Sequence, residues 1–201
     1  MKKELTTKGE KTRLRLLAAA EHEFGGKGFH AASVSSITLR AKVAQGTFYF
    51  YFGGKEEIFS TLVREIGHTL RKRMGEAVAR QADRIAAERS GLCAFLRFAA
   101  EHPGLYRIVQ ESQFVDAAVY REYYERVAQG YARGLSAAAE RGELRPGDAA
   151  VRAWAIMGIG HFLGLRYCLW QGCEPDAAVV DQVMDFIAGG MAPQARGGAA
   201  A

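Results

Sequence analysis

Apolar residues recur at helical spacing through almost the whole of this chain, and this periodicity limits its possible folds more than any other feature. No sustained alternation of apolar and polar residues indicates a strand, and only four prolines interrupt the 201 residues. Hydrophobic residues make up 49% and charged residues 24% of the chain, a balance that is typical of a globular protein with a buried core. The sequence therefore predicts an all-α fold.

Capping residues and glycine or proline breaks divide the pattern into about nine helices. We expect Gly25-Gly26 with Gly28 to end the first helix, and Ser33 and Ser90 to cap the second and the fifth. The expected ranges are 10–24, 34–41, 45–51, 55–78, 90–101, 105–109, 116–141, 149–170 and 176–188. They form an N-terminal three-helix module at 1–54 and a larger helical bundle at 55–192, followed by a Pro/Gly/Ala-rich tail at 193–201 that is predicted to be disordered.

Positive charge is concentrated in the first quarter of the chain. Residues 1–55 carry ten Lys or Arg and four Glu, a net charge of +6, whereas the rest carries seventeen basic and eighteen acidic residues, a net of −1. A basic module attached to a near-neutral body is typical of a nucleic-acid-binding protein. A solubilising tail would explain the lysines up to Lys8, but not Arg40, Lys42 and Lys55 further along.

The most informative segment is GFHAASVSSITLRAKVAQGTFYFYFGGKEEIF, at residues 28–59. It predicts two short helices joined by a turn. Phe48 and Phe52 are four residues apart on the second of these helices, so they can share a packed face with Ile37 and Val43. Several aromatic residues are then left exposed on one short helix, which is unfavourable unless something docks there. The pattern favours a recognition helix that enters the DNA major groove.

The segment resembles the DNA-binding domain of the TetR family of bacterial transcriptional regulators over about residues 10–65, most specifically in Gln45–Phe52 and the lysine that follows. The resemblance implies DNA contacts, with Gln45 reading a base edge, Thr47 and Phe50 meeting thymine methyls, and hydroxyls and lysines binding phosphates. The candidate residues are Ser33, Ser35, Ser36, Lys42, Gln45, Gly46, Thr47, Tyr49, Phe50, Tyr51 and Lys55. The alternative is that the aromatics all belong to the core and the serines are ordinary caps.

Two residues of the turn depart from the family pattern. Lys42 stands where the family commonly has Gly, and Ala44 stands where it has Ser or a similar cap. Lysine is strained in a left-handed turn conformation, and alanine has no side-chain oxygen to cap a helix. Thr38 also places a hydroxyl where the family often has Ala. We therefore expect a less stable or slightly altered turn, or an added phosphate contact from Lys42.

The larger bundle is rich in aromatic residues, which are expected to line a cavity for a small lipophilic or aromatic effector. The candidate ligand-binding residues are Phe95, Phe98, Tyr106, Glu111, Phe114, Tyr123, Tyr124, His161, Phe162 and Arg166. The alternative for each of them is a place in the core, and His161 is equally explained as a hydrogen-bonded core or interface residue. Further arginines leave an anionic effector possible. By resemblance, the last two helices form a homodimer interface, which suits a palindromic DNA operator.

These features predict a DNA-binding transcriptional regulator, a repressor that a small-molecule effector releases from its operator. A constitutive or architectural DNA-binding protein without an effector is the alternative, and a helical enzyme is disfavoured because no nucleophile elbow, phosphate loop or metal cluster is present. No cofactor and no metal are expected. Without a signal peptide or a membrane-length apolar run, the chain is expected to be cytoplasmic and nucleoid-associated. Of the three cysteines, Cys168 and Cys173 are interpreted as buried structural thiols, with a redox pair of these two as the alternative.

Overall fold

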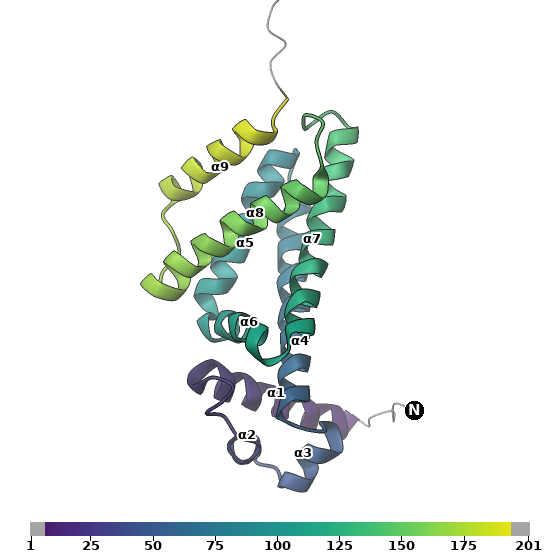
Figure 1. The fold of residues 1–201 in the computed structure, drawn as a ribbon, viewed down its shortest axis with the longest axis vertical. Helices are drawn as coiled ribbons and strands as arrows, with labels where there is room; N and C mark the ends of the chain where they lie inside the picture. The colour runs from purple at the N-terminus through teal and green to yellow at the C-terminus, as the bar shows by residue number, and fades with distance from the viewer. Residues whose placement is uncertain (1–6, 194–201) are drawn as a thin grey trace, which may run out of the picture. The chain divides into compact units, whose positions relative to one another are not determined.

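The computed structural model describes residues 7–193 and is built from helices throughout (Figure 1). Within this range it has nine α-helices, one π-helix and no strand, which confirms the predicted all-α fold. The α-helices are α1 (Thr7–Lys27), α2 (Val34–Ala41), α3 (Gln45–Tyr51), α4 (Lys55–Val78), α5 (Arg84–Glu101), α6 (Pro103–Val115), α7 (Ala117–Glu140), α8 (Ala149–Leu163) and α9 (Ala177–Met191), and the π-helix η1 is Gly164–Gln171. Most of the predicted tail, from residue 194 on, lies outside the described residues.

The chain divides into two compact units. The first comprises the chain up to Gly67 together with His102–Tyr123, and the second comprises His68–Glu101 and the chain from Tyr124 on. These limits differ from the predicted domains at 1–54 and 55–192, because α6 packs on α1 and joins the first unit. Helices α4 and α7 each contribute residues to both units.

Of the glycines predicted to end the first helix, Gly25 and Gly26 lie inside α1, which continues to Lys27, whereas Gly28 follows directly after its last residue. Gly25 instead allows α1 and α6 to approach, because a Cβ atom at this position would lie 3.1 Å from the Cα of Gly104. The helix ends at Gly28, whose φ of +80° is left-handed and whose N–H still bonds the Phe24 carbonyl at 2.8 Å.

The core of the first unit is an aromatic cluster surrounded by aliphatic side chains. The Phe59 ring meets those of Phe24 and Phe29 edge-on, with centroid distances of 5.1 and 5.0 Å. Leu16 and Ile58 are fully buried beside them in the same unit. Helices α1 and α4 thus share this aromatic cluster, and Ile37 of α2 and Phe48 of α3 are fully buried in the same unit.

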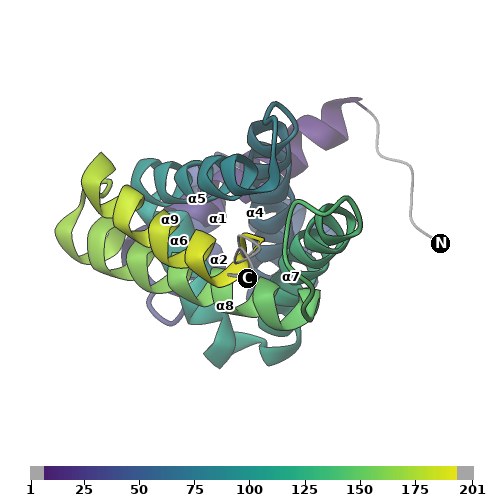
Figure 2. The ribbon, with the colours of Figure 1, turned by 90° about the horizontal axis from the view of Figure 1, so that it is seen from above.

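In the second unit, α5 is longer than predicted and α8 is shorter. Helix α5 begins at Arg84 and is capped by Asp83, whose carboxylate accepts the backbone N–H of Ala86 at 2.8 Å; the predicted cap, Ser90, lies inside the helix. Helix α6 of the first unit is also longer, running from Pro103 to Val115 in place of 105–109. After Leu163 the chain continues as the π-helix, which apolar periodicity does not distinguish from an α-helix. Helices α8 and α9 lie side by side in both views (Figures 1 and 2).

Candidate nucleic-acid interface

Helix α2 begins with the reciprocal cap that its serines suggest. The Ser33 hydroxyl accepts the N–H of Ser36 at 3.0 Å, and the Ser36 hydroxyl accepts the N–H of Ser33 at 3.1 Å. Ser33 and Ser35 are exposed and Ser36 is half-buried. The capping interpretation is therefore correct for Ser33 and Ser36, and capping leaves Ser35 available on the surface. Their predicted phosphate contacts stay predictions.

The turn between α2 and α3 has the strained geometry that its sequence predicts. Lys42 has φ 53° and ψ 50°, and it is the one residue other than glycine with positive φ among the described residues. The N–H of Val43 bonds the Thr38 carbonyl at 3.1 Å, which completes a helix C-cap that glycine usually forms. For a lysine this conformation costs about 1–2 kcal/mol. Ala44 caps α3 without a side-chain hydrogen bond, as expected.

Helix α3 has one buried face and one exposed face. Phe48 is fully buried and Phe52 nearly so, and Ile37 of α2 is fully buried in the same unit. Tyr49 and Phe50 are 55% and 59% exposed on the other face. Gln45 and Gly46 are exposed, and Thr47 and Tyr51 are half-buried. The aromatics therefore do not all belong to the core, which excludes the alternative interpretation of this helix.

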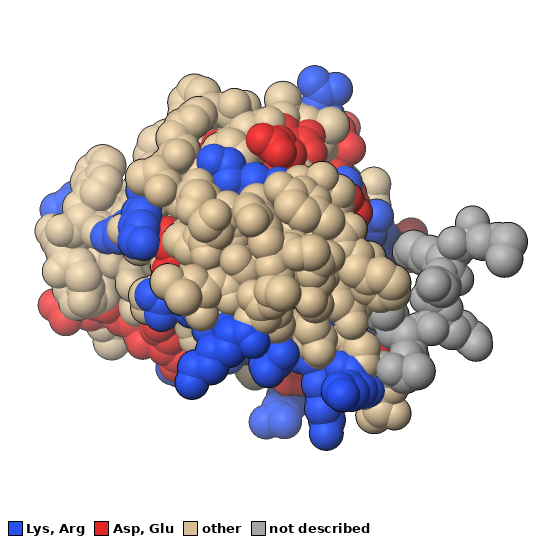
Figure 3. All heavy atoms as spheres, turned by 90° about the horizontal axis from the view of Figure 1, so that it is seen from below, with Lys and Arg blue, Asp and Glu red and all other residues tan. Residues whose placement is uncertain are grey.

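Lys and Arg side chains lie along one edge of this face of the molecule, and the centre of the face is uncharged. Figure 3 views the first unit from the end that carries α2 and α3, and Lys and Arg side chains gather along the lower edge of an uncharged central area. Leu39 of α2 is 81% exposed, the largest value among the exposed large apolar residues, and the sequence analysis did not single it out. An uncharged, partly aromatic surface with a cationic margin suits a DNA groove flanked by phosphates.

A buried carboxylate that the sequence analysis missed joins α1 to α2. Glu23 is 1% exposed, and it accepts hydrogen bonds from Lys27 Nζ and Arg40 Nε, both at 2.7 Å. These bonds, first from Lys27 and then from Arg40, lower the pKa of Glu23 to about 2. The i, i+4 spacing of Glu23 and Lys27 was visible in the sequence, but nothing in it indicated Arg40 as a partner.

Lys55 is held inside the first unit. Its ammonium donates to the carbonyls of Phe29 and Ala32 at 2.9 and 3.0 Å, and it lies 4.2 Å from the centroid of the Phe29 ring. These two bonds use two of the three N–H donors of the ammonium, so the third remains for the predicted phosphate contact. The structure therefore gives Lys55 a structural role that the sequence analysis did not expect.

Glu111, a candidate ligand-binding residue, also serves the first unit. Both of its carboxylate oxygens accept the N–H of Phe29, at 2.9 and 2.8 Å. This pairing ties α6 to the loop that precedes α2, across 82 residues of sequence. No local pattern marks such a contact.

The ten candidate ligand-binding residues are distributed over both units. Tyr106, Glu111, Phe114 and Tyr123 belong to the first unit, and Phe95, Phe98, Tyr124, His161, Phe162 and Arg166 belong to the second. Phe114 and Phe162 are exposed, whereas Phe98 is buried. In the second unit the His161 ring lies 3.3 Å from the Tyr124 hydroxyl, and burial lowers the pKa of His161, which fits its interpretation as a hydrogen-bonded core residue.

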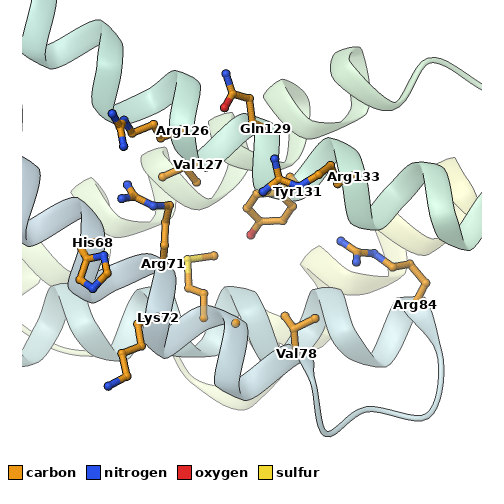
Figure 4. A pocket seen from close by; sticks show the side chains of 13 residues that line it. His68, Arg71, Lys72, Val78, Arg84, Arg126, Val127, Gln129, Tyr131 and Arg133 are labelled. Atoms are coloured by element: carbon orange, nitrogen blue, oxygen red, sulfur yellow. The ribbon is translucent and has the colours of Figure 1, made fainter.

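The second unit contains a cavity of about 560 Å³ between α4 and α7, next to the start of α5 (Figure 4). This volume is in the range of small-molecule sites. None of the ten candidate residues lines it, because they were chosen for aromatic character, whereas most of the lining consists of cationic and aliphatic side chains.

Other chemistry is sparse in the part of the chain that the structure describes. No three His, Cys, Asp or Glu residues between 7 and 193 are grouped to hold a metal ion. No helix in that range is long and apolar enough to cross a membrane. The three cysteines are free, and Cys173 is exposed, contrary to the prediction that it is buried like Cys168. Cys168 is buried, and burial raises its pKa to about 11, so its thiol is a poor nucleophile.

Residues 16–62 match the family described as bacterial regulatory proteins, tetR family. These residues form a segment similar to the N-terminal domain of that family. An uncharacterised helix-turn-helix transcriptional regulator of Bacillus subtilis (strain 168), YdgC, is 44% identical over 68 residues. That match spans 34% of this chain and only 35% of the relative, about a third of its length. The residues that match the family, 16–62, include the second half of α1, all of α2 and α3, and the first turns of α4.

Two solved structures show that the likeness in fold extends over most of the chain. The fatty acid degradation regulator FadR from Bacillus halodurans has a TM-score of 0.78 at 22% identity, covering 92% of this chain and 96% of its own. The ketosteroid transcriptional regulator KstR2 of Mycobacterium tuberculosis has a TM-score of 0.65 at 22% identity, covering 90% and 95%. Both are described as regulators, and at this level of identity the likeness concerns the fold.

Proposed function

We propose that this protein is a transcriptional repressor that binds a palindromic DNA operator as a homodimer and leaves it when a small molecule binds the second unit. The exposed face of α3 carries the proposal. Tyr49 and Phe50 expose apolar surface on a helix whose other face is anchored by Phe48. Such a helix is fitted to enter a major groove, with Gln45 available for a base edge.

A recognition helix of seven residues contacts few base pairs, so a second copy is needed for a specific site. Helices α8 and α9 supply a suitable surface. Trp154 of α8 and Phe186 of α9 are 50% and 76% exposed, and Arg152 is the one Lys, Arg, Asp or Glu residue of α8. Exposed apolar area of this kind marks an interaction site. A symmetric contact between two copies would bury it and set the spacing of the two recognition helices.

Placing a charge on this surface is expected to break the dimer. Phe186→Glu should weaken self-association by a hundredfold or more, roughly, since it removes a large apolar contact and buries an unpaired carboxylate. Analytical ultracentrifugation of the purified protein measures the effect. Leu14→Glu is the matched control, because Leu14 is also a large apolar residue, 61% exposed, and lies on α1 of the first unit. Equal dissociation constants for the two variants would contradict the proposed interface.

The effector part of the proposal is supported by the cavity of the second unit. Helix α4 carries Lys55 in the first unit and cavity residues from His68 to Val78 in the second, so one helix links both sites along the chain. An effector that favours a different position of α4 would alter DNA affinity, and operator DNA would weaken the effector reciprocally, typically ~5–150-fold. A constitutive DNA-binding protein would show no such coupling.

Selection of binding sites from random DNA tests the DNA-binding proposal. The selected sites should contain two inverted half-sites. In the Gln45→Ala variant, the preference at one base pair of each half-site should fall by about 1–3 kcal/mol, because a bidentate amide contact is lost. Gln81→Ala, an exposed glutamine of the second unit, is the control and should change nothing. Selection of asymmetric sites, or of none, would overturn the proposal.

A further inference from the structure

The cavity between α4 and α7 has a strongly one-sided charge. Its lining includes five Lys or Arg residues and one His, and no Asp or Glu. The cationic side chains are Arg71, Lys72, Arg84, Arg126 and Arg133. Figure 4 shows the guanidinium groups of Arg71 and Arg126 near each other at one end of the cavity and Arg84 at the other end. No carboxylate lines the cavity itself, so an anionic group that enters it meets cationic donors and no like charge in the lining.

The rest of the lining is mostly apolar. Met74 and Val78 of α4 face the cavity from one side, and Val127 and Tyr131 of α7 from the other. Met74 and Val127 are buried. Burial raises the pKa of Tyr131, so its hydroxyl stays protonated and can donate a hydrogen bond. The cavity therefore offers an apolar wall for a hydrocarbon or aromatic body together with donors for an anionic group.

Arg84 is built into the cavity wall. Its Nε donates to Glu88 Oε1 at 2.7 Å, and Glu88 is 2% exposed. Gly134 of α7 makes room for the guanidinium group, since a Cβ atom there would overlap Arg84 Nη1. The cation is thus held in place before any ligand arrives, which lowers the entropy cost of binding.

From this arrangement we propose that the cavity binds an amphipathic organic anion, with a phosphate or carboxylate headgroup on the arginines and an apolar body against Met74, Val78 and Val127. The inference rests on the proposed function, because it names the chemical class of the effector. It narrows that class: the sequence allowed a lipophilic, planar or anionic effector, and the observed lining favours one that is both apolar and negatively charged.

Isothermal titration of the purified protein with decyl phosphate, decanoate and decanol tests the inference. The two anions should bind, the phosphate more tightly because it carries more charge, and decanol should bind at least about tenfold more weakly than either. Arg133→Glu should weaken decyl phosphate about tenfold by replacing attraction with repulsion. Arg121→Glu is the matched control, since both arginines are exposed on α7 and only Arg133 lines the cavity.

Three results would overturn the inference: no binding of either anion, equal affinity for decanol and decyl phosphate, or equal losses in the two α7 variants. The titrations contain no DNA, so their outcome is separate from that of the operator selection. A protein that selects a palindromic site but binds neither anion would retain the proposed regulator function and lose this effector class. A protein that binds the anions but selects no DNA site would retain the anion-binding cavity and lose the proposed regulator function.

Discussion

Glu23→Gln is expected to lower the free energy of unfolding of the first unit by on the order of 3 kcal/mol at neutral pH. The figure follows from the depression of the Glu23 pKa from 4.5 to about 2, at about 1.4 kcal/mol for each unit. A glutamine keeps the shape of the side chain and loses its charge. Lys27 and Arg40 would then lose the charged group that pairs them and joins α1 to α2.

The same pairing predicts a distinctive dependence on pH. Because the folded-state pKa is lowered, the contribution of Glu23 is complete above pH 4.5 and is lost as the pH falls toward 2. Denaturant unfolding of the wild type and the variant should therefore differ most at pH 7 and converge in acid. Glu21→Gln, an exposed residue two positions earlier, should unfold like the wild type at every pH. A constant difference between wild type and Glu23→Gln from pH 7 to pH 3 would show that the carboxylate charge is not responsible.

Lys55→Met is expected to destabilise the first unit by about 3 kcal/mol, which combines the loss of two hydrogen bonds to a charged donor with the loss of a cation–π contact. Methionine preserves the length of the apolar stem, so packing changes little. Thermal unfolding measures the effect without DNA. A lysine that only contacts phosphates would not change the stability of the free protein when it is replaced.

Lys42→Met is the matched comparison for Lys55→Met. Lys42 is exposed, and lysine and methionine are equally strained at its positive φ, so the free energy of unfolding should stay the same. If Lys42 contacts a phosphate, DNA affinity falls and the slope of log K against log salt decreases by about one contact. Should Lys55→Met leave stability intact and change only that slope, the two carbonyl bonds would contribute nothing to the fold.

Local physical rules were sufficient to predict the short helices of the N-terminal domain. The ranges of α2, α3 and the start of α4 follow from the Ser33 cap, the two apolar faces and the glycine pair after Phe52. Even the left-handed Lys42 and the uncapped Ala44 were predicted, because a helix end depends on neighbours within a few residues. The division of α3 into buried and exposed aromatics followed in the same way from helical spacing.

The roles of the charged side chains depend instead on partners that are distant in the sequence. Lys55 turns to carbonyls 23 and 26 residues before it, and Glu111 caps an amide 82 residues away. The cationic cavity arises only where α4 and Arg84 meet α7. The α7 residues that line it lie more than forty positions after Arg84 in the sequence. The sequence determines the chemistry of each side chain. Whether that side chain contacts a carbonyl, a phosphate or a ligand depends on which distant chain segments the fold brings next to it.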